Sequence, residues 1–292
     1  MTDRAGKAFV LLQRILPKHL MTSAIHWLAG IRAVPVKNWL ISRFASAYDV
    51  DLEEVLLPVP EGFASFNEFF TRELATDARP IEMDPQTMAS PVDGTVSAAG
   101  RIDGKTLIQA KGITYSLPDL LATDLAIAEE FVNGSFATIY LAPYNYHRVH
   151  CPLDAELRSA LYVPGALYSV NEKTVAGLPG LFTGNERLVC RFRCAFGPMI
   201  VIFVGALHVG SISTPWTGKI RPQKSGVAQL LDLQQSRHST ELRKGDLLGW
   251  FNMGSTVILL LPERSCQWHP NLLPGSRLRM GEGIASVPSQ PS

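Results

Sequence analysis

Near the C-terminus the sequence reads Trp250-Phe251-Asn252-Met253-Gly254-Ser255-Thr256 and continues as Val257-Ile258-Leu259-Leu260-Leu261. A short apolar run that follows a turn-forming tripeptide is typical of a strand buried on both faces. Similar runs at 137–141 and 199–204 are separated by Gly and Pro turns. From about residue 90 onward the sequence therefore predicts a β-rich domain, with one helical segment near 117–131.

The Gly254-Ser255-Thr256 step also carries a candidate reaction. Glycine tolerates strained backbone angles, and the Ser255 hydroxyl stands next to the carbonyl that precedes it. Attack of Ser255 Oγ on the Gly254 carbonyl carbon would convert the amide into an ester. Elimination and hydrolysis would then leave a pyruvoyl group as a new N-terminus. Such a tripeptide more often simply starts a strand, so the chemical interpretation depends on two further motifs.

The composition is that of a globular protein. The chain has 292 residues, 46% hydrophobic and 18% charged, which is enough for one large domain or two ordinary ones. The net charge of +1 gives no signal for nucleic acid. The four cysteines form no Cys-x-x-Cys pair, so we interpret them as buried thiols in a reducing compartment and expect no metal site. No segment reaches the roughly 20 apolar residues of a membrane-spanning helix, and the N-terminus does not resemble a signal peptide.

Residues 1–48 differ in composition from the rest of the chain. From Arg4 to Tyr48 there are seven Lys or Arg residues and no Asp or Glu. Apolar residues recur between them at spacings of three and four, which predicts short amphipathic helices divided at Pro17 and at 30–35. Basic helices with Trp and Leu on the other face suit a membrane surface that carries anionic lipid. The alternative is an ordinary helical subdomain packed on the body of the protein.

The second motif is Tyr146-His147-Arg148-Val149-His150, which follows a predicted strand and lies between two prolines. Histidine both accepts and donates a proton near neutral pH. Two histidines beside an arginine favour a catalytic role, with metal ligation as the rival interpretation. Cys151 is a poor geometric partner for His150 in a metal site. In an extended segment His147 and His150 would point to opposite faces and so would have separate tasks, whereas in a helical turn they would share a face and the separation would be less clean.

The third motif is Pro91-Val92-Asp93-Gly94. An Asp-Gly pair is first of all a turn signal, so a simple hairpin is the alternative here. A nucleophile needs a base, however, and the base needs a group that orients it. Asp93, one histidine of the second motif and Ser255 would complete such a set from three distant segments.

Together these segments resemble the phosphatidylserine decarboxylase family, whose members depend on a pyruvoyl group and act in phospholipid synthesis. The resemblance covers nearly the whole chain and includes, in order, Phe66-Asn67-Glu68-Phe69-Phe70, Pro91-Val92-Asp93-Gly94, Gln109-Ala110-Lys111-Gly112, Tyr115-Ser116-Leu117, Tyr146-His147-Arg148-Val149-His150, Tyr162-Val163-Pro164-Gly165, Ser169-Val170-Asn171, Leu181-Phe182, Asn185-Glu186-Arg187 and Gly254-Ser255-Thr256. In the family leucine usually precedes the last tripeptide, and here Met253, of similar volume, takes its place. The ordered set is highly specific, and the extreme C-terminus is unmatched.

The resemblance implies a role for each matching residue. Ser255 would become the pyruvoyl group, which is the covalent pyruvate cofactor, and the chain would split after Gly254. Asp93 and His150 would form the triad with Ser255 that drives self-cleavage, and His147 would be the candidate proton donor in decarboxylation. The amine of phosphatidylserine would form a Schiff base with the pyruvoyl ketone. That ketone would take up the electron pair released with CO₂, and the product would be phosphatidylethanolamine.

The residues and the resemblance together predict an organisation. The expected fold is α+β, with amphipathic membrane-associating helices at 1–48, a β-rich catalytic domain at 49–283 and a flexible tail at 284–292. Self-cleavage would give a β chain of residues 1–254 and an α chain of residues 255–292. The two chains would stay together as a heterodimer, which is expected to dimerise further. The enzyme would be a peripheral protein on the cytoplasmic side of the cell membrane, where phosphatidylserine is its partner.

Three other functions are alternatives on the sequence alone. A hydrolase or acyltransferase would use Ser255, His150 and Asp93 without cleavage, although the sequence lacks a Gly-x-Ser-x-Gly elbow around the serine. A non-enzymatic membrane-binding module would leave the three motifs unexplained. A pyruvoyl-dependent decarboxylase of a soluble amino acid would have no use for a basic, apolar N-terminus.

Overall fold

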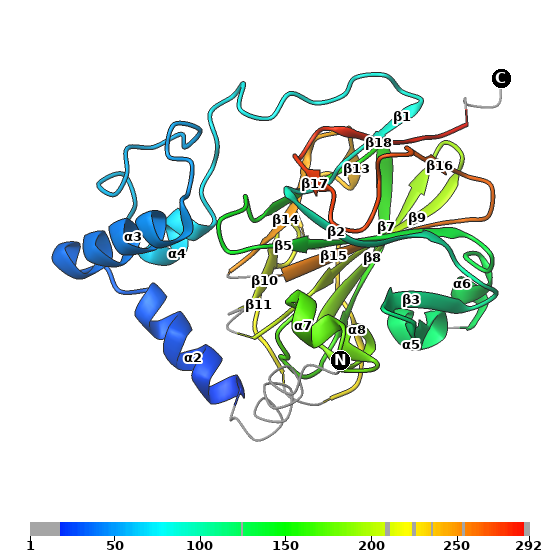
Figure 1. The fold of residues 1–292 in the computed structure, drawn as a ribbon, viewed down its shortest axis with the longest axis horizontal. Helices are drawn as coiled ribbons and strands as arrows, with labels where there is room; N and C mark the ends of the chain where they lie inside the picture. Colours follow the sequence, from blue (N-terminus) through cyan, green and yellow to red (C-terminus); the bar gives the residue numbers. More distant parts are fainter. Residues whose placement is uncertain are drawn as a thin grey trace.

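The computed structural model describes residues 18–123, 125–207, 211–223, 226–234, 236–252 and 255–288. Helices at the N-terminus precede a body built mainly of strands, which confirms the predicted α+β fold (Figure 1). The helices are α2 (Lys18–Ala29), α3 (Val34–Tyr48), α4 (Phe66–Phe70), α5 (Leu117–Leu121), α6 (Leu125–Glu129), α7 (Glu172–Val175) and α8 (Leu181–Gly184). Within these ranges, no helix combines the length and the apolar character that a membrane span requires.

The body is organised around a nine-stranded antiparallel sheet in the described part of the chain. Its strands lie in the order β12 (Gln229–Leu230), β7 (Ala155–Val163), β8 (Arg187–Cys194), β9 (Gly197–Val204), β15 (Ser255–Leu261), β5 (Ser135–Leu141), β2 (Gly94–Arg101) and β17 (Arg277–Leu278), and β13 (Glu241–Leu242) also pairs with β7. A second sheet has the order β11 (Gly218–Ile220), β10 (Ile212–Thr214), β14 (Leu247–Phe251) and β6 (Arg148–His150). The remaining strands form a sheet of β1 (Thr87–Ala89), β18 (Gly283–Ser286) and β16 (Gln267–Trp268) and a hairpin of β3 (Thr106–Ala110) and β4 (Ile113–Ser116).

The strand β15 lies near the middle of the large sheet, between β5 and β9. Every residue of β15 is buried, which confirms the buried strand predicted from its apolar run. Alternate residues of a strand face opposite sides of the sheet, so an uninterrupted apolar sequence is stable only where both faces are covered. The start of β15, where Ser255 lies, is therefore held in a rigid and dry part of the molecule.

The register of the large sheet aligns residues of five strands in one row. Thr256 of β15 pairs on one side with β5 and on the other with β9. The same row continues through β5 to β2 and through β9 to β8. Its members, from one side to the other, are Arg187, Val204, Thr256, Tyr140 and Thr95. This row determines which residues of the neighbouring strands lie beside the start of β15.

The N-terminal helices pack on a cluster of phenylalanines. The short helix α4 begins at Ser65, whose side chain accepts a hydrogen bond from Glu68 N (3.2 Å), as in a capping box. Phe66 of α4 meets Phe44 of α3 edge to face, with ring centroids 5.1 Å apart. These contacts form a small core separate from that of the sheets, and they fix α4 between α3 and the body.

Two predicted boundaries are wrong. The expected loose tail from residue 284 does not begin there, because β18 pairs with β1 and β16, and Val287 is buried. Residues 289–292 lie outside the described residues. The helical segment expected near 117–131 is divided into α5 and α6, since Ala122 adopts a left-handed conformation that ends α5. The part of 1–48 that the structure describes, from residue 18, forms α2 and α3.

Candidate active site

The segment from Leu141 to His150 joins the other two motifs. The peptide N–H of His150 donates to O of Pro91 (2.8 Å), the first residue of the third motif. At the other end of the segment, Phe251 N donates to His147 O (3.1 Å), four residues before Ser255. Three segments that are far apart in the sequence therefore meet at one end of β5, as the sequence analysis expected.

Ser255 is the first residue of β15 and is 0% exposed. Its Oγ has no hydrogen-bond partner among the described residues. A buried hydroxyl without a partner costs about 1–3 kcal/mol, so such a group usually serves a purpose other than stability. Met253 and Gly254, and with them the predicted cleavage site, lie outside the described residues.

Asp93 is held by a guanidinium group and not by a histidine. Arg79 donates to its two carboxylate oxygens from Nε (2.8 Å) and Nη2 (2.6 Å), and Met280 N donates to Oδ1 (2.8 Å). Arg79 also pairs with Glu54 (2.8 Å). Burial alone would lower the pKa of Arg79, but bonds to these two carboxylates raise it. The Asp93 carboxyl group is therefore fixed by three hydrogen bonds in a mostly buried place.

Replacement of Arg79 by methionine is expected to destabilise the fold by about 3–5 kcal/mol, since it leaves the Asp93 carboxylate buried without its cation. The matched control is Arg101→Met, which removes an exposed ion pair to Glu263 and should cost under about 1 kcal/mol. Urea unfolding followed by tryptophan fluorescence gives both values. Equal stabilities of the two variants would show that Arg79 does not neutralise Asp93.

His150 is oriented by a backbone carbonyl. Its Nδ1 lies 2.7 Å from Gly245 O, so Nδ1 carries the proton and donates. Its Nε2 lies 3.0 Å from Tyr146 Oη and therefore accepts from that hydroxyl. Gly245 has a φ of 91°, and a side chain there would collide with Ile81, so only glycine presents the carbonyl in this way. Burial lowers the pKa of His150, while its bond to Gly245 and the charge of Asp93 oppose that change.

His147 lies in a different environment. Its ring stacks on Phe70 of α4, with centroids 4.1 Å apart, and Nε2 lies 3.4 Å from Pro143 O. Nδ1 has no partner within the described ranges. Burial and the neighbouring charge of Arg72 lower the pKa of His147 to about 3, so the ring is neutral near pH 7. The two histidines thus occupy separate surroundings, as an extended segment predicts.

The three predicted triad residues approach one another without forming a relay. In the described residues no hydrogen bond joins Asp93 to His150, and none joins His150 to Ser255 Oγ. The carboxylate of Asp93 and both ring nitrogens of His150 are instead occupied by other partners. Their mutual influence is through charge alone. Any triad must therefore form by a rearrangement of side chains.

Several residues of the site were not singled out from the sequence. Asn252 is buried, donates to Ser211 O, Ser211 Oγ and Ser213 Oγ, and accepts from Asn67 of α4 (3.1 Å). This network fixes the chain just before the predicted cleavage site. Arg72, after α4, donates to Tyr144 O (3.1 Å). Because this contact joins residues that are far apart in the chain, no local sequence pattern identifies Arg72 as part of the site.

A cavity of about 160 Å³ lies over Asp93 and is also lined by Arg72, Arg79 and Tyr146. Burial lowers the pKa of Arg72 to about 10, so its guanidinium stays charged near pH 7. Arg72 Nε and Nη1 have no partner in the described part of the chain. The site therefore holds a cation that is available to an anionic group.

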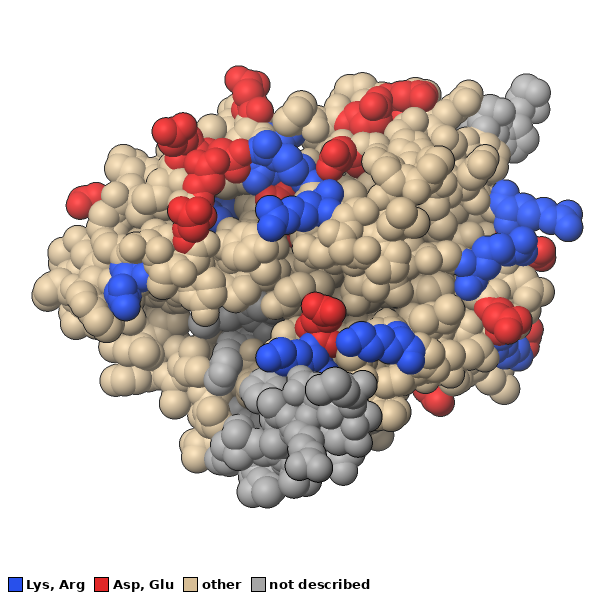
Figure 2. Space-filling view, viewed as in Figure 1, with Lys and Arg blue, Asp and Glu red and all other residues tan. Residues whose placement is uncertain are grey.

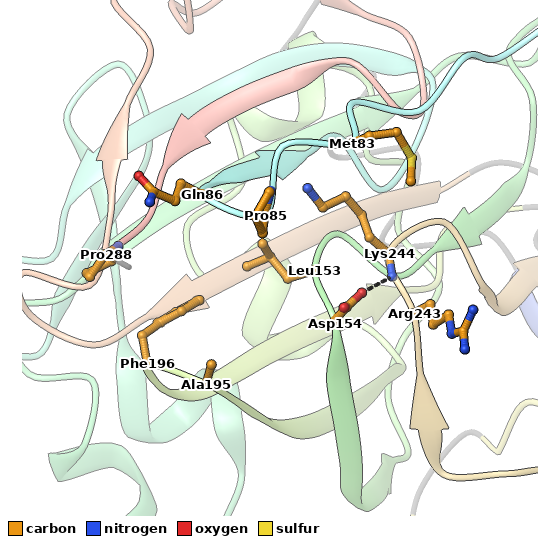
Figure 3. A pocket seen from close by; sticks show the side chains of 10 residues that line it. All are labelled: Met83, Pro85, Gln86, Leu153, Asp154, Ala195, Phe196, Arg243, Lys244 and Pro288. Atoms are coloured by element: carbon orange, nitrogen blue, oxygen red, sulfur yellow. Dashed lines mark hydrogen bonds between the residues drawn. The ribbon is translucent and has the colours of Figure 1, made fainter. Parts of the chain in front are cut away.

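The larger cavity in Figure 3, of about 490 Å³, lies elsewhere. It is lined by Arg243 and Lys244, and Lys244 N donates to Asp154 (2.7 Å). None of the predicted catalytic residues lines it. Its connection to the site is indirect, since Gly245, the next residue of the same turn, supplies the carbonyl that orients His150.

The described ranges contain no cluster of three His, Cys, Asp or Glu side chains that would hold a metal ion. The four cysteines are free thiols, and Cys151, Cys190 and Cys194 are buried. Burial raises the pKa of Cys190 to about 12, which keeps that thiol protonated and unreactive.

The similarity of this chain to known proteins extends over both the candidate site and the N-terminal helices. The model of a family described as phosphatidylserine decarboxylase matches residues 66–286, and one described as PSD matches residues 8–49. The phosphatidylserine decarboxylase proenzyme of Saccharophagus degradans is 43% identical over 282 residues, which span 97% of this chain and 98% of that protein. The proenzyme of Alcanivorax borkumensis is 46% identical over 275 residues, 94% of each chain. That of Azotobacter vinelandii is 44% identical over 281 residues, 96% of this chain and 98% of its own.

Proposed function

Because this chain belongs to the phosphatidylserine decarboxylase family and is a carboxy-lyase of that kind, we propose that it makes its own pyruvoyl group from Ser255. With that group it converts phosphatidylserine to phosphatidylethanolamine and CO₂. The observation that carries the proposal is the buried Ser255 Oγ, which has no hydrogen-bond partner in the described part of the chain and lies at the start of β15, near the histidine and aspartate motifs. Intact mass under denaturing conditions tests it.

Self-cleavage begins with the Ser255 hydroxyl. In the proposal, His150 Nε2 takes the hydroxyl proton as Oγ attacks the carbonyl carbon of the preceding residue. Nε2 already carries a lone pair, because Gly245 O holds the proton on Nδ1. It must exchange the Tyr146 hydroxyl for that of Ser255. Asp93 contributes negative charge that favours the imidazolium formed in this step.

The described residues around Ser255 fit a pyruvoyl group, since none of them holds its Oγ in a hydrogen bond. When formed, the group supplies a ketone that makes a Schiff base with the substrate amine and accepts the electron pair left as CO₂ departs. Buried neighbours on both faces of β15 exclude water from that reaction.

His147 and Arg72 are proposed to act on the substrate. An anionic group of phosphatidylserine near Arg72 would find guanidinium donors, Nε and Nη1, that bond to none of the described residues. The same negative charge would raise the pKa of His147 and let it carry a proton to the carbanion. The stack of His147 on Phe70 holds the ring in place for this transfer.

The two chains are proposed to remain one molecule after cleavage. The α chain would begin with β15, which is hydrogen-bonded on both sides by strands of the β chain. It would also contain β17 and β18, which pair with β2 and β1. Its separation would therefore expose the core of the large sheet. We propose in addition that two such heterodimers associate, which light scattering in solution would check.

The helices α2 and α3 are proposed to bind the membrane surface. On the face seen in Figure 2, the N-terminal helices at the left of the molecule present few charged side chains. Trp27 is 73% and Trp39 65% exposed, and an apolar groove of about 290 Å³ lies between the two helices. Exposed apolar patches of this kind mark interaction sites. The absence of acidic residues between Arg4 and Tyr48 favours anionic lipid and the cytoplasmic face as the partner surface.

Replacement of both Trp27 and Trp39 by glutamate is expected to weaken binding to phosphatidylserine-containing liposomes at least about tenfold, because burial of each large apolar side chain contributes about 1.5–3 kcal/mol. Binding of the unmodified chain should also weaken with salt. Leu273→Glu, at an exposed position of the body, is the control. Flotation with liposomes measures all three proteins, and equal flotation of the double variant would refute the membrane surface proposed for α2 and α3.

A further inference from the structure

Glu186 is a buried acid that the chemistry above does not use. Its side chain is 0% exposed, and neither carboxyl oxygen has a hydrogen-bond partner among the described residues. The Tyr162 hydroxyl lies nearby and accepts from Gln223 N (2.8 Å), and its interaction with the carboxyl group lowers the pKa of Glu186 by less than burial raises it. A carboxyl group buried without a cation keeps its proton. Burial accordingly raises the pKa of Glu186 to about 8.

The register of the large sheet sets Glu186 in line with Ser255. Val204 pairs with β15 on one side and with β8 on the other. One residue further along, Gly205 N donates to Glu186 O (2.8 Å), and the same register sets Ser255 on the other side of Gly205. Residues of one row point to the same face of a sheet. Glu186 and Ser255 therefore share a face, with one residue between them.

That intervening residue has no side chain. A Cβ atom at Gly205 would lie 3.6 Å from Glu186 Cβ and 3.7 Å from Glu186 Oε1. The carboxyl group thus lies next to Gly205, on the face of the sheet that a side chain there would occupy. Ser255 Oγ is also buried without a described partner. Two groups without a hydrogen-bond partner among the described residues, one an acid and one the proposed nucleophile, therefore lie on the same face of the sheet with Gly205 between them.

We propose that Glu186 is the acid that protonates Cβ of residue 255 when the pyruvoyl group is completed. The inference rests on the proposed self-processing. Once the ester has formed and the hydroxyl proton has passed from His150 to the new amine, His150 Nε2 takes the Cα proton, and the Cα–Cβ double bond forms. The Cβ–Oγ bond breaks, and its electron pair leaves with the carboxylate of Gly254. An aminoacryloyl group remains at the start of the α chain.

Glu186 then acts on the aminoacryloyl group. Glu186 gives its proton to Cβ, which becomes the methyl group, while the nitrogen lone pair forms the carbon–nitrogen bond of an iminium ion. Water adds to the iminium carbon, ammonia leaves, and one proton returns to Glu186. The ketone is then complete and the acid is restored. Chain scission precedes this step, so it does not need Glu186.

The experiment compares scission with ketone formation in the full chain during cell-free translation. Gel analysis measures scission, and reaction of the native protein with phenylhydrazine measures the ketone at the same time points. In Glu186→Gln, a neutral residue of the same shape, scission should stay within about twofold of the unmodified chain. Ketone formation should slow about 100-fold, which is typical of a lost positioned acid. Glu186→Asp keeps an acid and should recover part of the rate, and Tyr162→Phe should change neither rate.

The outcomes separate this inference from the proposed function. Ketone formation that keeps pace with scission in Glu186→Gln would overturn the role of Glu186. An uncut Glu186→Gln chain beside a processed Glu186→Asp chain would also overturn it, since it would place the acid at scission. An unmodified chain that stays uncut would instead refute the self-processing on which the inference rests.

Discussion

Ser255→Ala is expected to remain a single chain of 292 residues, because alanine has no hydroxyl to attack the preceding carbonyl. Without a pyruvoyl group the substrate amine meets no electrophile. Decarboxylation should therefore fall by about a million-fold or more, to the uncatalysed rate. A denaturing gel shows the first effect, and release of labelled CO₂ from phosphatidylserine shows the second.

The matched control is Thr256→Val at the neighbouring position of β15. Thr256 is also buried and its Oγ1 also lacks a described partner, so the variant removes a comparable hydroxyl without removing the nucleophile. It should be processed normally. A Ser255→Ala chain that still splits between residues 254 and 255 would refute the proposal that Ser255 is the nucleophile.

Replacement of each of the two histidines is expected to slow a different step of the reaction. His150→Ala and Asp93→Ala should accumulate uncut chain, with scission slowed at least about 100-fold, because the first removes the base and the second its supporting charge. His147→Ala should be cut normally but release CO₂ about 100- to 10,000-fold more slowly, because its loss removes the proton donor. Gel analysis together with the CO₂ assay distinguishes the two classes.

Tyr146→Phe is the control for His150. It removes the hydroxyl that occupies His150 Nε2 and leaves the bond to Gly245 in place. Scission should therefore continue at least as fast as in the unmodified chain. Normal scission in His150→Ala would refute His150 as the base. Uncut His147→Ala would instead transfer that task to His147, whose backbone lies beside Phe251.

The fold could be predicted where local pattern reflects burial. The apolar runs of β5, β9 and β15 have no polar residue for an exposed face, so their burial follows from composition. At residues 284–287 the sequence Ile-Ala-Ser-Val is short and followed by prolines, a pattern that predicts a loose tail and not a paired strand. Its order comes from pairing with β1, almost 200 residues away, and no local signal reports such a partner.

The site could be predicted as a set of segments but not as a set of contacts. The motifs predict that Asp93, the two histidines and Ser255 come together; the backbone segments that carry them meet at one end of β5, and the roles of the side chains stay a prediction. The partners of Asp93 could not be foreseen. Arg79 stands in a connector without periodicity, and Met280 contributes only a backbone N–H. The alignment of Glu186 with Ser255 likewise depends on the register of three strands, which a sequence does not specify.

The most direct test of self-processing is the intact mass of the purified, unmodified protein under denaturing conditions. We predict two chains in place of one of 32.0 kDa. One ends at Gly254, and the other has 38 residues, 292 minus 254, with a blocked N-terminus that is lighter than a serine start by one ammonia. A single full-length mass in an enzyme that decarboxylates phosphatidylserine would contradict the account.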